Sequence, residues 1–258
     1  MLELVNNYFI IFCYYIICGF GLIRIINLSH NIRSNKYSHH KIIFIQNTNY
    51  LVFYLTLAIL AFYFILSITP VTDADSLDYH LGFPLEIIRK GGLYFKLEWK
   101  HSRVIGLGEF INLIGLIIRT DNIGSSLNFI SLCFLLLVTY NYTSNKQINI
   151  LLTLVILSTP LLLQLIPNQK PQFYGVCAIV IPTIAIIKIV NINSKHLFVI
   201  IGSVFFTISL KYSFYVSGGI SLLFIIYTMK NKLLINILYC IVLYLIFLFP
   251  LHLLKYNF

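Results

Sequence analysis

Residues 50–80 read YLVFYLTLAILAFYFILSITPVTDADSLDYH, and this stretch decides the fold. Its first part, residues 50–69, contains no charged side chain. A helix of about 20 mostly apolar residues crosses the hydrocarbon core of a bilayer, so 50–69 predicts a membrane-spanning helix. Asp73, Asp75 and Asp78 follow directly, and they predict that the chain leaves the membrane at this point.

The composition of the whole chain repeats this pattern. Of the 258 residues, 59% are hydrophobic and only 10% are charged, whereas soluble domains carry about 25% charged residues. Such an excess of apolar residues suits a bilayer better than a globular core. The net charge of +10 does not indicate nucleic-acid binding, because no run of five basic residues occurs. Scattered Lys and Arg at helix ends anchor membrane helices instead.

The apolar segments predict an all-α fold, a polytopic transmembrane bundle of about eight or nine helices that forms one domain over residues 1–258. Two segments are ambiguous. Residues 104–118 are short for a span, and 196–229 is too long for one helix and is interrupted at Lys211, which predicts two helices. The clearer candidate spans are 8–27, 50–69, 123–141, 148–166, 172–190 and 232–253.

The basic segment 28–42 sets the expected orientation. It carries Arg33, Lys36, Lys41 and three histidines without an acidic residue, and cytoplasmic loops are enriched in Lys and Arg. The loop after 50–69 is therefore expected on the extracytoplasmic side. We expect an integral, multi-pass protein of a plasma membrane, such as the bacterial inner membrane.

The loop at residues 70–105 concentrates the polar chemistry of the chain. Carboxylates can accept a proton from a hydroxyl, cations can stabilise phosphate charge, and aromatic rings can stack on sugars. The loop therefore predicts a site for a phosphorylated or hydroxyl-rich ligand. The alternative is a solvated loop that stops the preceding helix from sliding inward. Its acidic residues, five of the eight in the chain, are Asp73, Asp75, Asp78, Glu86 and Glu98, and its other notable residues are His80, Lys96, Trp99, Lys100, His101 and Arg103.

A short helix is predicted inside this loop. Leu81, Leu85 and Ile88 fall at helical spacing, Pro84 suits a helix start, and Gly91-Gly92 suits a helix end. An amphipathic helix of this kind is expected to lie along the membrane surface.

Polar residues within apolar segments are further candidates. Glu109 and Asn112, one turn apart, are expected to face a cavity or a partner, or Glu109 reaches interfacial water instead. Lys211 is placed to reach a lipid phosphate, or it is a lysine that extends to the interface. Asn128 and Gln164 are expected to form hydrogen bonds between helices.

The string Asp75-Ser76-Leu77-Asp78-Tyr79-His80-Leu81 resembles the first-loop motif of GT-C type glycosyltransferases, which runs roughly W-D-[ST]-L-x-Y-H-L-P. The resemblance covers about residues 50–255. Further similar pieces, in order, are Gly106-Leu107-Gly108-Glu109, Thr159-Pro160, Gln169-Lys170-Pro171-Gln172 and Ser209-Leu210-Lys211-Tyr212-Ser213.

This resemblance implies a polytopic enzyme in contact with membrane lipid. Its donor would be a sugar linked to polyprenyl phosphate, and its acceptor a glycan or lipid of the cell envelope outside the cytoplasm. By motif match Asp75 is the catalytic base, supported by Asp73. The resemblance also implies a set of substrate-binding residues: Asp78, Tyr79, His80, Arg103, Glu109 and Lys211.

The chain departs from the family pattern in two ways. Members often carry an acidic residue where this chain has 168–172, NQKPQ. Members are also commonly longer, so the chain is expected to be an N-terminal portion. No zinc site is indicated, because the five cysteines form no CxxC pair. A divalent cation, Mg²⁺ or Mn²⁺, remains open as a cofactor.

The electrostatics of Asp75 and two rival functions complete the sequence-based expectations. Like-charged Asp73 and Asp78 are expected to raise the pKa of Asp75 and make it a better base.

The first alternative to the glycosyltransferase is a non-enzymatic transporter or flippase component for envelope polysaccharide. Such a protein should place its polar groups near the bilayer midplane on broken helices. The second is an inactive remnant of the enzyme. The polar density of one external loop favours the enzyme.

Overall fold

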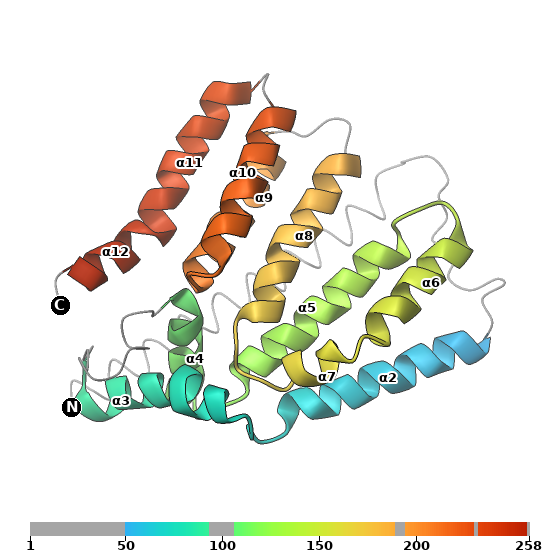
Figure 1. Ribbon diagram of the computed structural model, residues 1–258, viewed down its shortest axis with the longest axis horizontal. Helices are drawn as coiled ribbons and strands as arrows, with labels where there is room; N and C mark the ends of the chain where they lie inside the picture. Colours follow the sequence, from blue (N-terminus) through green and yellow to red (C-terminus); the bar gives the residue numbers. More distant parts are fainter. Residues whose placement is uncertain (1–49, 93–105, 189–193, 230–231, 257–258) are drawn as a thin grey trace. The chain divides into compact units, whose positions relative to one another are not determined.

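The computed structural model describes residues 50–92, 106–188, 194–229 and 232–256, and every regular element in these ranges is helical (Figure 1). The predicted all-α class is therefore confirmed for this part of the chain.

The chain divides into two units, Met1–Leu55 and Thr56–Phe258, and the contacts below lie within the second. The elements are α2 (Tyr50–Ile68), the π-helical turn η1 (Ser76–Leu81), α3 (Gly82–Lys90), α4 (Leu107–Ile117), α5 (Ile123–Tyr140), α6 (Lys146–Leu157), α7 (Leu161–Leu165), α8 (Gln172–Lys188), α9 (Ser194–Leu210), α10 (Phe214–Thr228), α11 (Leu233–Phe247) and α12 (Phe249–Tyr256).

Two predicted features of the helical pattern are confirmed, one break and one short helix. The apolar stretch 196–229 forms α9 and α10, which are separated at Lys211. The short helix of the first loop is α3, and it ends at Gly91, whose φ of 68° is in the left-handed region that favours glycine. Local sequence signals were sufficient in both cases.

Two other predicted spans are wrong as single helices, and proline is the reason in each. The segment 148–166 divides into α6 and α7 beside Pro160, and 232–253 divides into α11 and α12 beside Pro250. Proline lacks a backbone N–H and disfavours helical geometry in the residue before it. Each proline therefore ends one helix and lies at the start of the next.

The described helices differ in length and polarity. Only α5, with 18 residues, is long and apolar enough among them to cross a membrane by length and composition. Seven further apolar helical segments of 10–17 residues were found, and the first of them is Val52–Ile68, within α2. The predicted span 8–27 and the basic segment 28–42 lie outside the described residues.

Helix α9 is the centre of one group of packed helices. It contacts α8, α10 and α11, which run beside it in Figure 1. Its residues Leu197, Ile201 and Val204 are fully buried, and their spacing by four and three residues puts them on one face of the helix. This face fills the core between α9 and its neighbours.

Helix α5 connects a second group, because it contacts α6 and α8. Leu132 of α5 is fully buried in a cluster with Leu157 of α6 and Ile166. Tyr63 of α2 also belongs to this cluster, and its hydroxyl donates a hydrogen bond of 3.1 Å to the carbonyl of Leu157. These contacts fix the end of α2 against α6, directly before the acidic segment begins.

The start of α4 approaches two other elements closely at two glycines. A Cβ atom at Gly106 would overlap the backbone carbonyl of Leu210, at the end of α9. A Cβ atom at Gly108 would lie 2.6 Å from Cγ of Pro171, next to α8. The absence of a side chain at both positions lets the first turn of α4, with Glu109, reach the ends of α8 and α9.

This close approach yields a stability prediction. Gly106→Ala should lower the free energy of unfolding by about 1–3 kcal/mol, the usual cost of overpacking, because the new methyl group meets backbone atoms. Gly219→Ala on α10 is the matched control, since a Cβ there has nothing within 4 Å. Thermal unfolding of the purified variants measures the difference. Equal melting temperatures for Gly106→Ala and the unmodified protein would contradict the close approach.

Candidate functional site

The acidic segment between α2 and α3 is folded by hydrogen bonds to Asp73. Oδ2 of Asp73 accepts from the backbone N–H of Ser76 at 3.0 Å and from its hydroxyl at 2.8 Å. The carbonyl of Asp73 accepts from the N–H of Leu77 at 3.0 Å. An aspartate that accepts from an N–H three residues later starts a helical turn, so Asp73 begins the turn that continues as η1.

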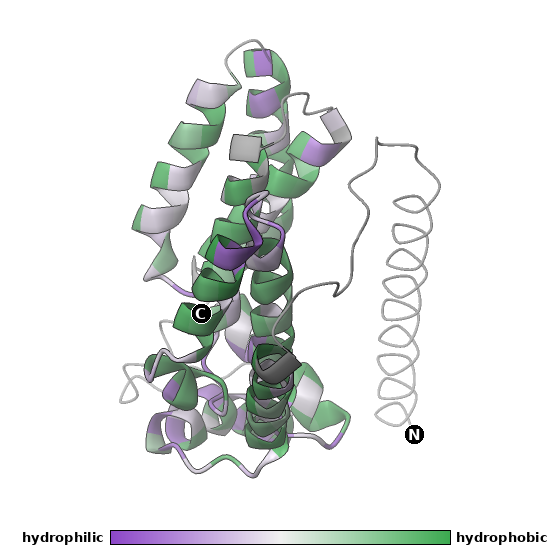
Figure 2. Ribbon diagram, turned by 90° about the vertical axis from the view of Figure 1, so that its right-hand side faces the viewer, coloured by the Kyte–Doolittle hydropathy of each residue, from purple (hydrophilic) through white to green (hydrophobic). Residues whose placement is uncertain are grey.

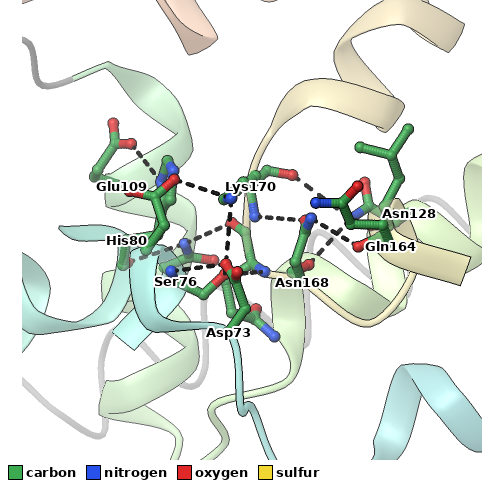
Figure 3. Close-up of polar contacts among 12 residues, drawn as sticks. Asp73, Ser76, His80, Glu109, Asn128, Gln164, Asn168 and Lys170 are labelled. Atoms are coloured by element: carbon green, nitrogen blue, oxygen red, sulfur yellow. Dashed lines mark hydrogen bonds and ion pairs between the residues drawn. The ribbon is translucent and has the colours of Figure 1, made fainter. Parts of the chain in front are cut away.

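Lys170 links this segment to the connection between α7 and α8 (Figure 3). Its Nζ lies 3.2 Å from Oδ2 of Asp73 and 2.9 Å from Oδ2 of Asp75. The side chain of Lys170 is only 14% exposed, whereas that of Asp75 is 54% exposed. One ammonium group therefore pairs with two carboxylates and offsets only part of their negative charge, and Asp75 is the more exposed of the two.

The charges of this cluster shift its pKa values in a consistent way. The hydrogen bond from Lys170 lowers the pKa of Asp75 despite partial burial. Burial alone would raise the pKa of Asp73, but the hydrogen bonds from Ser76 and the charge of Lys170 outweigh burial and lower it. Burial alone would lower the pKa of Lys170, but both aspartates together raise it.

The expected upward shift at Asp75 is therefore wrong. That expectation counted the like charges of Asp73 and Asp78, which are neighbours in sequence, and it did not include Lys170. In the folded chain the lysine is the nearest charged group to Asp75. A carboxylate with a lowered pKa is ionised at neutral pH and is a weaker base than an ordinary aspartate.

Gln169 connects the acidic segment to the start of α5. Its side chain is fully buried, and its backbone N–H donates to the hydroxyl of Ser76 at 3.1 Å. Its Oε1 accepts from the N–H of Gly124 at 2.8 Å, and its Nε2 donates to the hydroxyl of Ser125 at 3.2 Å. The residue before Lys170 is thus held by three fixed partners.

Asn112 of α4 and Asn128 of α5 fix the same connection from two sides. Nδ2 of Asn112 donates to the carbonyl of His80 at 3.0 Å and to that of Gln169 at 3.1 Å. Nδ2 of Asn128 donates to the carbonyl of Asn168 at 3.1 Å. The interhelical role predicted for Asn128 is confirmed, because its Oδ1 also accepts from the N–H of Tyr174 of α8 at 3.2 Å. For Gln164, the backbone carbonyl accepts from Nδ2 of Asn168 at 2.9 Å.

A buried pair, His80 and Glu109, lies beside this cluster. Nδ1 of His80 is 2.9 Å from Oε1 of Glu109, and the two side chains are 0% and 2% exposed. Oε2 of Glu109 accepts from the backbone N–H of Gly106 at 2.7 Å. Glu109 faces a partner, as the sequence predicted, and the alternative that it reaches interfacial water does not hold.

Four residues of the sequence-predicted site remain, and each has a different position. Tyr79 is buried, with its ring centroid 4.5 Å from that of His80, and burial followed by the charge of Glu109 raises its pKa. Lys211 lies between α9 and α10, and its charge contributes to the lowered pKa of Asp75. Asp78 is exposed and forms no ion pair with the rest of the described chain. Arg103 lies outside the described residues.

The residues that the sequence did not single out are Ser76, Gln169 and Lys170. The signal that was present is the polar run 168–172 between two apolar segments. That run was interpreted as a departure from an acidic pattern. The structure shows it as the partner of the acidic segment, to which it supplies the ammonium of Lys170.

The donor set does not fit a divalent cation. Among the residues that the structure describes, no group of three or more His, Cys, Asp or Glu side chains is arranged to hold a metal. Asp73 and Asp75 instead share the ammonium of Lys170. The lysine supplies one positive charge to this pair of carboxylates.

In the part of the chain that the structure describes, fold and site define a helical protein in which an Asp–Lys cluster and a buried His–Glu pair meet at the ends of apolar helices. Residues 11–257 match the family model described as the DUF1420 N-terminal domain, so the chain belongs to the DUF1420 family. A search of curated proteins and a search of solved structures found no match. The function is therefore argued from the site.

The Asp–Lys cluster predicts a pH-dependent stability. The pKa of both aspartates is lowered from 3.8, so their contribution is present above pH 3.8 and is lost as pH falls through the folded-state values. The pKa of Lys170 is raised from 10.5, so its contribution is present below pH 10.5 and is lost as pH rises through the folded-state value.

Lys170→Met should therefore destabilise the protein at pH 7, by about 0.5–1 kcal/mol because solvent screens the exposed carboxylates. The deficit should shrink as the pH falls below 3.8. Thermal unfolding between pH 3 and pH 7 measures it. Lys146→Met, at an exposed position on α6, is the control. A Lys170→Met deficit that does not change with pH would show that the lysine contributes packing and not charge.

Proposed function

We propose that the chain is a membrane glycosyltransferase of the GT-C type. It transfers a sugar from a polyprenyl-phosphate-linked donor to an extracytoplasmic acceptor, a glycan or lipid of the cell envelope. The observation that carries this proposal is the convergence of Asp73, Asp75 and Lys170 with His80 and Glu109. Carboxylates, a cation and an imidazole in one place suit an acceptor hydroxyl and a donor phosphate.

Exposed apolar side chains support a polytopic membrane bundle of about eight or nine helices. Leu234 of α11, Tyr227 of α10 and Val216 of α10 are 83%, 78% and 74% exposed. Large exposed apolar surfaces are unfavourable in water and suit the hydrocarbon of a bilayer. Figure 2 shows hydrophobic residues along most of the described helices. The integral, multi-pass location in a plasma membrane rests on this surface and on α5.

Lys170 is the residue that we propose for the donor phosphate. An ammonium pairs strongly with a phosphate oxygen, and this one is already positioned by two carboxylates at 2.9 and 3.2 Å. Lys211 adds positive charge near Asp75, and Arg103 remains a candidate by resemblance. A cation at this point would stabilise the negative charge that builds up as the phosphate leaves.

Asp75 is the carboxylate that we propose for the acceptor. It is more exposed than Asp73, with side-chain exposures of 54% and 38%. As an ionised carboxylate it can accept a hydrogen bond from the acceptor hydroxyl and orient it, while Asp73 holds Lys170 and the turn at Ser76. Asp78 and Tyr79 remain proposed sugar contacts from the resemblance.

A transporter of envelope polysaccharide is the second candidate. The feature that favours it is the pair of interrupted helices, α6 with α7 and α9 with α10, of which the second has Lys211 at its break. Transporters place their binding groups on such discontinuous helices. The enzyme is favoured because the ion pairs of Lys170 with Asp73 and Asp75 join two segments that connect long helices and do not lie in the middle of a helix.

The proposed orientation predicts a labelling pattern. In a chain with its five cysteines replaced, Thr72→Cys should react with an impermeant thiol reagent added outside intact cells, because Thr72 is exposed beside the acidic segment. Ser34→Cys, in the basic segment, should react only after the membrane is permeabilised. Labelling of Ser34→Cys alone in intact cells would reverse the orientation and the compartment of the site.

The proposed reaction predicts a strong effect of Asp75→Asn. Transfer of labelled sugar from native polyprenyl donors should fall by about 10²-fold, within the range for loss of a catalytic carboxylate, because the amide neither holds the Lys170 ammonium nor orients the hydroxyl as a charge does. Asp78→Asn should cost less, and Asp121→Asn, at an exposed position, should be neutral. The assay uses membranes with matched protein levels.

Near-normal transfer by Asp75→Asn would remove this carboxylate from the proposed site. Absence of transfer by the unmodified protein, together with uptake of a labelled polyprenyl-linked glycan into vesicles, would favour the transporter. Each result therefore assigns the chain to one of the two classes.

A further inference from the structure

The imidazole of His80 has one engaged nitrogen and one open nitrogen. Nδ1 contacts Glu109 at 2.9 Å, while Nε2 is buried and has no hydrogen-bond partner in the described part of the chain. Leaving a buried polar atom without a partner costs about 1–3 kcal/mol. Native proteins keep few such atoms, and catalytic groups are among them. The open nitrogen therefore points to a ligand group that completes it.

Glu109 determines which nitrogen of His80 carries the proton. One of its oxygens, Oε2, accepts from the N–H of Gly106 at 2.7 Å, which leaves Oε1 to accept from Nδ1–H of His80. In a neutral imidazole whose Nδ1–H donates to a carboxylate, Nε2 is the unprotonated acceptor. The carboxylate also lies in the first turn of α4, where the helix dipole stabilises negative charge.

The imidazole is held rigidly in this state. The carbonyl of His80 accepts from Nδ2 of Asn112 at 3.0 Å, and the ring of Tyr79 packs against the imidazole at a centroid distance of 4.5 Å. The imidazole lies within electrostatic range of Asp75, the carboxylate proposed for the acceptor. Positioning by such supporting contacts is what a catalytic group requires.

We propose that His80 is the general base of the transfer reaction, with Nε2 as the atom that accepts the acceptor's proton and Glu109 as its positioning residue. This inference rests on the proposed function. In the step, the acceptor O–H gives its proton to Nε2, and the oxygen forms a bond to the anomeric carbon of the donor sugar. The bond from that carbon to the phosphate oxygen breaks, and its electron pair leaves on the polyprenyl phosphate beside Lys170.

The imidazolium that results is stabilised by Glu109, whose charge lies 2.9 Å away. It returns its proton to water after the product leaves, so the enzyme is restored without an added reactant. The arrangement is the general one in which a carboxylate orients an imidazole and stabilises its charged form. Asp75 cannot serve as well, because its carboxylate is already paired with Lys170 at 2.9 Å.

The titratable and charged groups around His80 determine how the rate of this step depends on pH. On the segment that carries His80, Tyr79 and Asp75 are its titratable neighbours, and Glu109 is the charged group that faces it from α4. Groups that act on these neighbours are Asp73, Lys170, Lys211 and, through Glu109, Tyr174 of α8.

The first experiment is the pH profile of sugar transfer in membranes for His80→Gln, Glu109→Gln and Asp75→Asn. Transfer by the unmodified protein should increase with pH, because a general base acts in its unprotonated form. Transfer by His80→Gln should be slower by about 10²- to 10⁴-fold. It should also lose the rising limb, which is the increase of transfer with pH. Glu109→Gln should lower transfer at least about tenfold and should move the rising limb to a different pH range. Asp75→Asn should lower transfer but leave the rising limb in its pH range. His196→Gln, at an exposed position on α9, should match the unmodified protein.

The second experiment does not depend on activity. The ¹⁵N shifts of the His80 ring, assigned by comparison with His80→Gln, should show the proton on Nδ1 in the unmodified protein. Glu109→Gln should weaken this preference. A proton on Nε2 in the unmodified protein would overturn the inference, because the proposed base would then have no free electron pair.

The outcomes separate the two proposals. Normal transfer by His80→Gln, or loss of the rising limb in Asp75→Asn but not in His80→Gln, would overturn the role of His80 and leave the glycosyltransferase standing. Absence of transfer by the unmodified protein would overturn the function and the base together, even if the tautomer is the expected one.

Discussion

The ammonium of Lys170 between two carboxylates is the interaction on which the arrangement of the site depends. It joins the segment after α2 to the segment before α8, and beside it the N–H of Gln169 reaches the hydroxyl of Ser76, 93 residues earlier in the sequence. Without the lysine, Asp73 and Asp75 would repel each other close to the end of an apolar helix, where charge is costly. The lysine attracts the acidic segment to the segment before α8. The buried side-chain amides of Gln169 and Asn112 then form hydrogen bonds next to the ion pairs.

The parts of the fold that could be predicted are those with local causes. The end of α3 follows from Gly91, whose positive φ any other residue would resist, and the division of α9 from α10 follows from the polar residues at Lys211. The divisions beside Pro160 and Pro250 were not predicted, because an average over an apolar window gives a single proline little weight. The proline acts on the backbone and not on the hydropathy, so the break is a geometric event that the average cannot register.

The parts of the site that could be predicted are the residues, and the parts that could not are their pairings. Asp73, Asp75, His80 and Glu109 stand out because charge is scarce in this chain. Their partners depend on which helix ends meet, and this is determined by packing such as that of Gly106 against the end of α9. The wrong pKa direction for Asp75 has the same origin. Neighbours in sequence were known, whereas the dominant charge came from Lys170, in a distant part of the chain.

Two carboxylates in different environments suit two different tasks. Asp75 is half exposed and already matched by a cation, so it is stable as an anion and little inclined to take a proton. Glu109 is buried, and it serves at once as the acceptor for the N–H of Gly106, the residue directly before α4, and as the partner of His80. Because the same carboxylate holds the helix start and the imidazole, the orientation of His80 is tied to the backbone of α4. The imidazole is therefore positioned by the fold itself, through a helix whose start can approach α8 and α9 only because Gly106 and Gly108 lack side chains.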